Sequence, residues 1–109
     1  MKKNITFEVD LDKDNLPKHI TMKADDSVDI ESIKALMISA WDSSKKETLR
    51  IDLWTKDMTV IDMFITYHQT MLGMANSLEK STGNKKLADA LRDYCEFFAE
   101  DTEILNKKI

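Results

Sequence analysis

The segment from Thr48 to Met63 constrains the fold of this chain most, because it holds a strand pattern, a turn and a helix start in direct succession. Leu49, Ile51 and Leu53 alternate with charged or amphipathic residues, which is the period of two expected of a strand with one buried face. Thr59 follows, and its hydroxyl can accept from the first free N–H groups of a helix. The segment therefore predicts a fold of mixed α and β structure.

Two more strand patterns lie near the beginning of the chain. Residues 5–11 and 19–24 each alternate apolar with polar side chains. The stretch between them, residues 12–17, is rich in turn formers and ends in a proline. We therefore expect these two strands to form a hairpin.

Apolar residues at helical spacing predict three helices, over residues 30–42, 60–81 and 84–105, with a third strand over 47–55. Gly83 suits the position just after a helix, where the backbone turns left-handed. We expect the last residues, 106–109, to be a frayed end.

The expected order of elements is ββαβαα within a single domain of residues 1–109, which is long enough for one core. If the crossover through the first helix is ordinary, strands two and three run parallel and the first strand lies between them. The predicted fold class is α+β, a two-layer sandwich in which three helices cover one face of a three-stranded sheet.

Charge and composition limit the partners and the compartment. The net charge of −4 argues against binding to nucleic acid, whose phosphates attract basic proteins. No apolar stretch approaches the length of a membrane span, so we expect no membrane insertion. Glu8 interrupts the start of the chain before a signal peptide could form. Cys95 is the single cysteine, which fits a reducing compartment, and we expect a cytoplasmic protein.

The spacing of Asp10, Asp12 and Asp14 matches the first ligands of a calcium loop. The rest of that pattern fails, because Asn15 replaces the turn glycine and Pro17 stands among the ligand positions. We interpret the three carboxylates as a solvated hairpin turn and expect no metal site.

The remaining reactive residue types are few, and we expect no cofactor. His19 should lie on the open side of the sheet, His68 should be a partly buried histidine, and Cys95 a buried and inert thiol. An enzyme that uses Asp52 or Asp57 with one of the two histidines is a third and weaker hypothesis, which would require these groups to converge in a cleft.

We expect charged side chains of all three strands to share the open face of the sheet: Glu8, Asp10, His19, Lys23, Arg50 and Asp52. Such a face can be ordinary cross-strand charge pairing in solvent. It can also be a binding patch, because an exposed Trp beside an Arg is typical of interface hot spots. The candidate residues for protein interaction are Arg50, Asp52, Trp54 and Lys56.

Five stretches carry a resemblance that runs nearly from end to end: Lys18–Thr21, Leu49–Val60, His68–Leu72 with the following Met74-Ala75, Thr82–Lys85 and Leu91–Glu100. In them the chain resembles the gliding motility-associated protein GldC family. The resemblance implies a small soluble protein associated with surface gliding in bacteria that move without flagella, by machinery linked to a secretion system. It implies no catalytic activity, cofactor or site residue.

The main hypothesis is a non-enzymatic cytoplasmic accessory or adaptor protein that binds a protein of the gliding or secretion machinery. The contact would use the open sheet face, the turn after Trp54 or a free strand edge. The alternative is a small apolar-ligand binder with a pocket between the long helix and the sheet, lined by Phe64, Met71 and Met74. A homodimer through an edge strand or the last helix is a further possibility.

Overall fold

The computed structural model describes residues 1–107, in two compact units, Met1–Met58 and Thr59–Ile109. All five strands belong to the first unit and the helices to the second. The mixed α+β class is therefore confirmed. The single domain and the covering of a sheet by helices stay predictions, and the frayed end expected at residues 106–109 lies partly outside the described residues.

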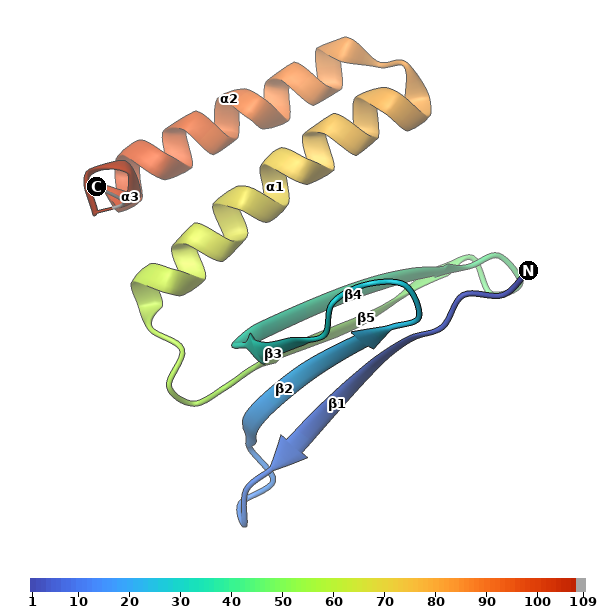
Figure 1. The fold of residues 1–109 in the computed structure, drawn as a ribbon. Coiled ribbons are helices and arrows are strands. Elements are labelled where there is room, and N and C mark those ends of the chain that lie inside the picture. The colour runs from blue at the N-terminus through green and yellow to red at the C-terminus, as the bar shows by residue number, and fades with distance from the viewer. Residues whose placement is uncertain (108–109) are drawn as a thin grey trace. The chain divides into compact units, whose positions relative to one another are not determined.

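The first sheet of the strand unit contains β1 (Ile5–Leu11), β2 (Pro17–Ala24) and β3 (Ile30–Ile33), in that order and all antiparallel (Figure 1). The hairpin expected from the first two alternating segments is confirmed. Ile20, on the central strand, is completely buried. The apolar side chains of β2 thus form the centre of this sheet.

The turn between β1 and β2 is organised by the carboxylate of Asp12. Its Oδ1 atom accepts from the backbone N–H groups of Asp14 at 2.8 Å and Leu16 at 3.1 Å. Asn15 adopts a left-handed conformation with φ of 61°, which asparagine tolerates better than most residues. The hairpin-turn interpretation is confirmed, since the central carboxylate of the calcium-like spacing holds the turn itself.

The second sheet is a hairpin of β4 (Ala35–Asp42) and β5 (Glu47–Trp54), paired from Ala35 opposite Trp54 to Asp42 opposite Glu47. Asp42 closes the connecting turn, because its Oδ1 accepts from the Ser44 hydroxyl at 2.7 Å and the Ser44 N–H at 3.0 Å. These two hydrogen bonds lower the pKa of Asp42. The predicted third strand is confirmed as β5.

The predicted helix over residues 30–42 is wrong, because this stretch forms β3 and β4. Its apolar residues satisfy helical spacing, but Leu36, Ile38 and Ala40 also alternate, so the pattern fits both structures. Pairing with other strands decides between them. Residues before Lys34 pair with β2, and residues after it pair with β5.

The predicted topology is wrong for the same reason. Without a helix between them, successive strands connect directly, and every strand pair in residues 1–107 is antiparallel. β1 therefore lies at an edge, paired with β2 alone, and not between two other strands. The order ββαβαα becomes five strands followed by helices.

The helical unit contains α1 (Val60–Thr82), α2 (Lys85–Thr102) and a short α3 (Ile104–Lys107). The expected cap at Thr59 is confirmed, since its hydroxyl accepts from the Asp62 N–H at 3.1 Å. The expected end at Gly83 is confirmed too, with φ of 73°, a value that glycine adopts without strain.

Small side chains fill the contact between α1 and α2. Ala75 of α1 and Ala88, Cys95 and Ala99 of α2 are buried, which lets the two helix backbones approach closely. Beyond them, the Phe64 and Phe98 rings meet edge to face with centroids 6.0 Å apart. The buried thiol expected at position 95 is confirmed, and burial raises its pKa.

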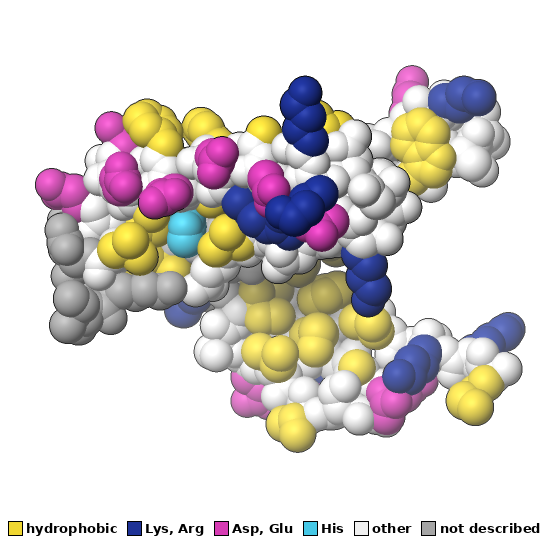
Figure 2. Space-filling model, turned by 90° about the horizontal axis from the view of Figure 1, so that it is seen from above, with side chains coloured by type: hydrophobic (Ala, Val, Ile, Leu, Met, Phe, Trp, Pro, Cys, Tyr) yellow, Lys and Arg dark blue, Asp and Glu magenta, His cyan; other side chains and the backbone are white. Residues whose placement is uncertain are grey.

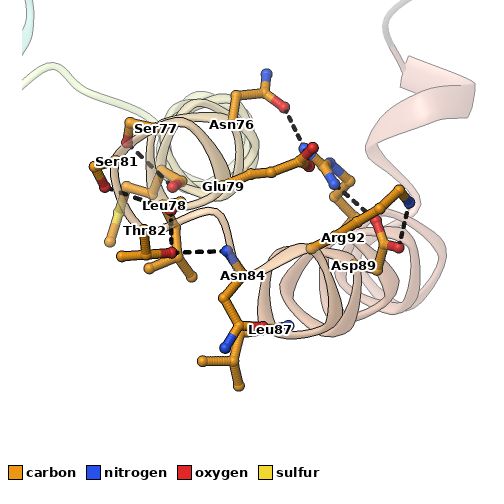
Figure 3. A network of polar contacts seen from close by, with 12 residues as sticks. Asn76, Ser77, Leu78, Glu79, Ser81, Thr82, Asn84, Leu87, Asp89 and Arg92 are labelled. Carbon is orange, nitrogen blue, oxygen red and sulfur yellow. Dashed lines mark hydrogen bonds and ion pairs between the residues drawn. The ribbon is translucent and has the colours of Figure 1, made fainter.

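Charged side chains join the same two helices on another face (Figure 3). The guanidinium of Arg92 in α2 reaches Glu79 at 2.8 Å and donates to the Asn76 amide oxygen at 3.0 Å, both in α1. It also binds Asp89 at 2.7 Å, and Lys85 binds the same carboxylate at 2.6 Å. Figure 2 shows basic and acidic side chains close together on the surface.

Candidate functional site

The structure brings three of the four predicted interaction residues together. Arg50, Asp52 and Trp54 alternate along β5 and therefore share one face of the second sheet. The side chains of Arg50 and Asp52 are 47% and 37% exposed, and Trp54 is 53% exposed. All three are accessible to another molecule.

Arg50 is held in place by two short contacts on this face. One guanidinium nitrogen donates to the Ser39 hydroxyl on β4 at 2.6 Å, and the other binds the Asp52 carboxylate at 2.6 Å. A guanidinium has five N–H donors, so several remain for a partner after these two bonds. The sheet thus presents a positioned cation with free donors.

A second tryptophan lies on the same face. The register places Trp41 opposite Thr48 and Ser39 opposite Arg50, so these residues follow one another along the face that ends at Trp54. Trp41 is 64% exposed. We call Trp41, Arg50, Asp52 and Trp54 the tryptophan face.

Sequence reasoning missed Trp41, because it assigned residues 30–42 to a helix. The alternation of Leu36, Ile38 and Ala40 with residues 37, 39 and 41 was the signal that could have found it. Read as a strand, this alternation places Trp41 on the more polar side. A tryptophan at each end of the face then frames the Arg50–Asp52 pair.

Lys56, the fourth predicted residue, lies elsewhere. Its ammonium binds the Asp12 carboxylate at 2.7 Å and so ties the chain after β5 to the turn between β1 and β2. The Asp12 side chain is only 12% exposed. The Lys56 hydrogen bond and the backbone N–H of Leu16 lower the pKa of Asp12 to about 2. Lys56 therefore has a structural partner and stands apart from the tryptophan face.

The residues around Lys56 brace the end of β5. Thr55 is buried, its N–H donates to the Lys34 carbonyl at 2.8 Å, and its hydroxyl donates to Asp57 at 2.5 Å. Asp57 also binds the Lys34 ammonium at 2.8 Å, and these contacts lower its pKa, Lys34 contributing most. The segment after Trp54 thus fixes the position of that tryptophan on the sheet.

The other face of the second sheet is aliphatic, as the strand pattern predicts. It carries Leu36 and Ile38 from β4 with Leu49, Ile51 and Leu53 from β5. Leu49 and Ile51 are 61% and 40% exposed. At the turn end of the hairpin, the surface is hollowed by an open depression of about 290 Å³ lined in part by Trp41 and Leu49.

The charged residues of the first sheet form a separate surface. His19 lies opposite Asp10, with its Nδ1 3.5 Å from the carboxylate, and its Nε2 is 3.0 Å from the Glu31 carbonyl oxygen. The expectation that these residues would share a sheet with Arg50 and Asp52 is wrong, because β5 pairs with β4 and not with β1. Within residues 1–107, no group of His, Cys, Asp or Glu has an arrangement that could hold a metal ion.

The side chains considered for catalysis have other partners. Asp52 binds Arg50 and Asp57 binds Lys34. His68, partly buried as expected, stacks on Phe98 with ring centroids 6.4 Å apart.

The alternative ligand pocket was expected to be lined by Phe64, Met71 and Met74. Phe64 packs against Phe98, whereas Met74 lines an open depression of about 370 Å³ with Leu78 and Leu91. This hollow belongs to the helical unit itself.

A family model described as gliding motility-associated protein GldC-like matches residues 17–104, which confirms the resemblance seen in the sequence. No curated protein and no solved structure matches the chain significantly. No helix among residues 1–107 is long and apolar enough to span a membrane.

Proposed function

This chain belongs to the GldC-like family of gliding motility-associated proteins, and from that membership we propose that it is a non-enzymatic accessory protein of gliding. It acts by binding another protein of the gliding or secretion machinery. The contact is made by the tryptophan face of the second sheet.

The observation that supports this proposal most directly is the exposure of two tryptophans beside a positioned arginine. Trp and Arg are the residues most enriched at the energetic centres of protein interfaces. Trp41 and Trp54 offer large apolar surfaces, and the Arg50 guanidinium between them offers directional donors. A partner strand or loop with aromatic and acidic side chains would complement this face.

The non-enzymatic part of the proposal rests on how the titratable residues are used. The carboxylates of Asp52 and Asp57 neutralise Arg50 and Lys34. His19 approaches a carboxylate and a carbonyl on the outside of a sheet. These contacts give each of these side chains a structural role, which supports a function without catalysis.

The test compares capture of partner proteins from a gliding bacterium by the wild-type chain and by Trp41→Ala, Arg50→Ala and Trp54→Ala. We expect each substitution to reduce the captured partner at least about tenfold, because hot-spot truncations cost roughly 2 kcal/mol or more. The free energy of unfolding should stay within about 1 kcal/mol of wild type, since all three side chains are exposed.

Phe97→Ala is the matched control, because Phe97 is an aromatic residue on α2 with 57% exposure. It should leave capture unchanged. In the cell, the three face variants should impair gliding when they replace the wild-type chain. Phe97→Ala should preserve gliding. Equal loss with Phe97→Ala, or full capture by all three face variants, would contradict the proposal.

We propose a cytoplasmic location as well. Cys95 is the single cysteine, so the chain can form no internal disulfide, which fits a reducing compartment. Fractionation of cells that express the tagged full chain tests the location. Recovery with periplasmic or outer-membrane proteins would contradict it.

A further inference from the structure

We infer that a second copy of this chain pairs with β5 through its open edge, which joins two β4–β5 hairpins into one four-stranded antiparallel sheet. Among the described strands, β5 pairs with β4 alone, so its other edge has no strand neighbour. An isolated two-stranded hairpin is only marginally stable in water, and further strands stabilise it. The inference goes beyond the proposed function and does not depend on it.

The hydrogen-bond pattern shows which residues face the open edge. The Thr55 N–H donates to the Lys34 carbonyl, which fixes the phase of the ladder between β4 and β5. Alternate residues, such as Ile51, therefore bond toward β4. Arg50 and Asp52 lie at the intervening positions, so their backbone N–H and C=O groups point to the open edge. A second strand can bond only in a register that pairs these positions with one another.

The charges on β5 select one register. With a two-fold axis at Ile51, Arg50 of each copy lies opposite Asp52 of the other, and Leu49 lies opposite Leu53. An axis at Arg50 places two arginines opposite each other, and an axis at Asp52 places two aspartates opposite each other. Opposite charges in cross-strand pairs stabilise a sheet and like charges destabilise it. Of the three registers with axes at Arg50, Ile51 and Asp52, the one at Ile51 is therefore the one in which the charges of the strand are self-complementary.

The strand unit has two other long open edges, on β4 and on β1, and neither has this property. β4 carries a single charged side chain, Asp42 at its last position, so no register within it pairs opposite charges. β1 carries two charged side chains, Glu8 and Asp10, and both are acidic. Each two-fold antiparallel register that brings these residues together sets acid against acid. Charge thus favours pairing at the edge of β5 and opposes it at the edge of β1.

The paired sheet extends both faces of the hairpin. On one face, Trp54 of one copy lies beside Thr48 and Trp41 of the other. On the opposite face, Leu49 and Ile51, which are exposed in the single chain, pack against Leu53 and Ile51 of the second copy. Such a contact is isologous, because both copies contribute the same strand.

The molar mass of the full chain in solution tests this inference, measured by sedimentation over a wide range of protein concentration. The monomer mass is 12.6 kDa, and we expect the mass to approach twice this value as concentration rises. Arg50→Asp alone and Asp52→Arg alone should each raise the dimer Kd at least about tenfold, because both symmetric charge pairs become repulsive.

Two charge-exchange experiments distinguish this register from any other contact between two copies. An equimolar mixture of the Arg50→Asp and Asp52→Arg chains should form a heterodimer, since opposite charges then meet at both positions. The double variant R50D/D52R should form a homodimer, because it exchanges the charges within each chain. Recovery of pairing also shows that the single variants are folded.

A monomer at all concentrations would overturn the inference, as would a dimer that both single variants leave unchanged or a mixture that fails to pair. These measurements use the pure chain. They are therefore separate from the capture experiment, in which full capture by the tryptophan-face variants would contradict the proposed function instead.

Discussion

Asp12 couples the stability of the strand unit to pH. Its carboxylate accepts from two backbone N–H groups and binds Lys56, and its pKa falls to about 2. The unfolded chain should titrate near the ordinary value of about 4, so the folded state holds the proton more weakly. The stabilisation is therefore complete above about pH 4 and is lost as pH falls toward about 2.

We predict that Asp12→Asn lowers the free energy of unfolding at neutral pH and weakens its dependence on pH between about 4 and about 2. Lys56→Met should have a similar effect, because the Lys56 hydrogen bond contributes most to the pKa shift. Urea unfolding at several pH values measures both. Asp14→Asn is the control from the same turn, and an equal loss there would show that the contacts of Asp12 are not responsible.

Cys95 should be protected from thiol reagents while the protein is folded. It is 1% exposed and burial raises its pKa, so both access and thiolate formation are reduced. We predict that a disulfide reagent labels the native protein at least about a hundredfold more slowly than the unfolded chain. Mass spectrometry after timed labelling measures this ratio, and rapid native labelling would show that the contact between α1 and α2 opens readily.

At the scale of elements, the two glycines of the chain should respond oppositely to the same substitution. Gly83 ends α1 with φ of 73°, whereas Gly73 lies within α1, and an added Cβ would meet no atom within 4 Å at either position. We predict that Gly83→Ala destabilises the protein by about 1 kcal/mol through backbone strain. Gly73→Ala should stabilise it by about 0.5–1 kcal/mol through helix propensity.

Urea unfolding of the two variants checks this contrast. Because neither added methyl group meets a neighbour, side-chain packing cannot account for a difference between them. A change of the same sign in both variants would contradict the assignment of Gly83 as the left-handed end of α1.

Elements whose signals are local were predictable from the sequence. The turn chemistry of residues 12–17 gave the first hairpin, and the cap at Thr59 and the end at Gly83 gave the bounds of α1. Residues 30–42 were not predictable in this way, because their apolar pattern fits a helix and a strand alike. Long-range pairing with β2 and β5 decides their structure, which the alternation of Leu36, Ile38 and Ala40 permits but does not specify.

The candidate site was partly predictable for the same reason. Arg50, Asp52 and Trp54 share a face because β5 is a strand, which its alternation predicts. Trp41 joins them only through the register between β4 and β5. The contact of Lys56 with Asp12 was not predictable, because the two residues are remote in sequence and no local pattern signals such an ion pair.

At the scale of the whole molecule, the placement of the spectroscopic probes allows a test of the single-domain prediction. Both tryptophans belong to the strand unit and the long helices belong to the helical unit. We predict that tryptophan fluorescence and helical circular dichroism report one unfolding transition with coincident midpoints in urea. Distinct midpoints would show that the two units unfold independently.

The contacts of residues 55–57 have a mechanical consequence for the strand that precedes them. Thr55 donates a hydrogen bond to the Lys34 carbonyl, Asp57 forms an ion pair with Lys34, and Lys56 forms an ion pair with Asp12. A force applied to the chain beyond Met58 would act on these hydrogen bonds and ion pairs together before it could separate β5 from β4. The tryptophan face would keep its structure under tension until these contacts break.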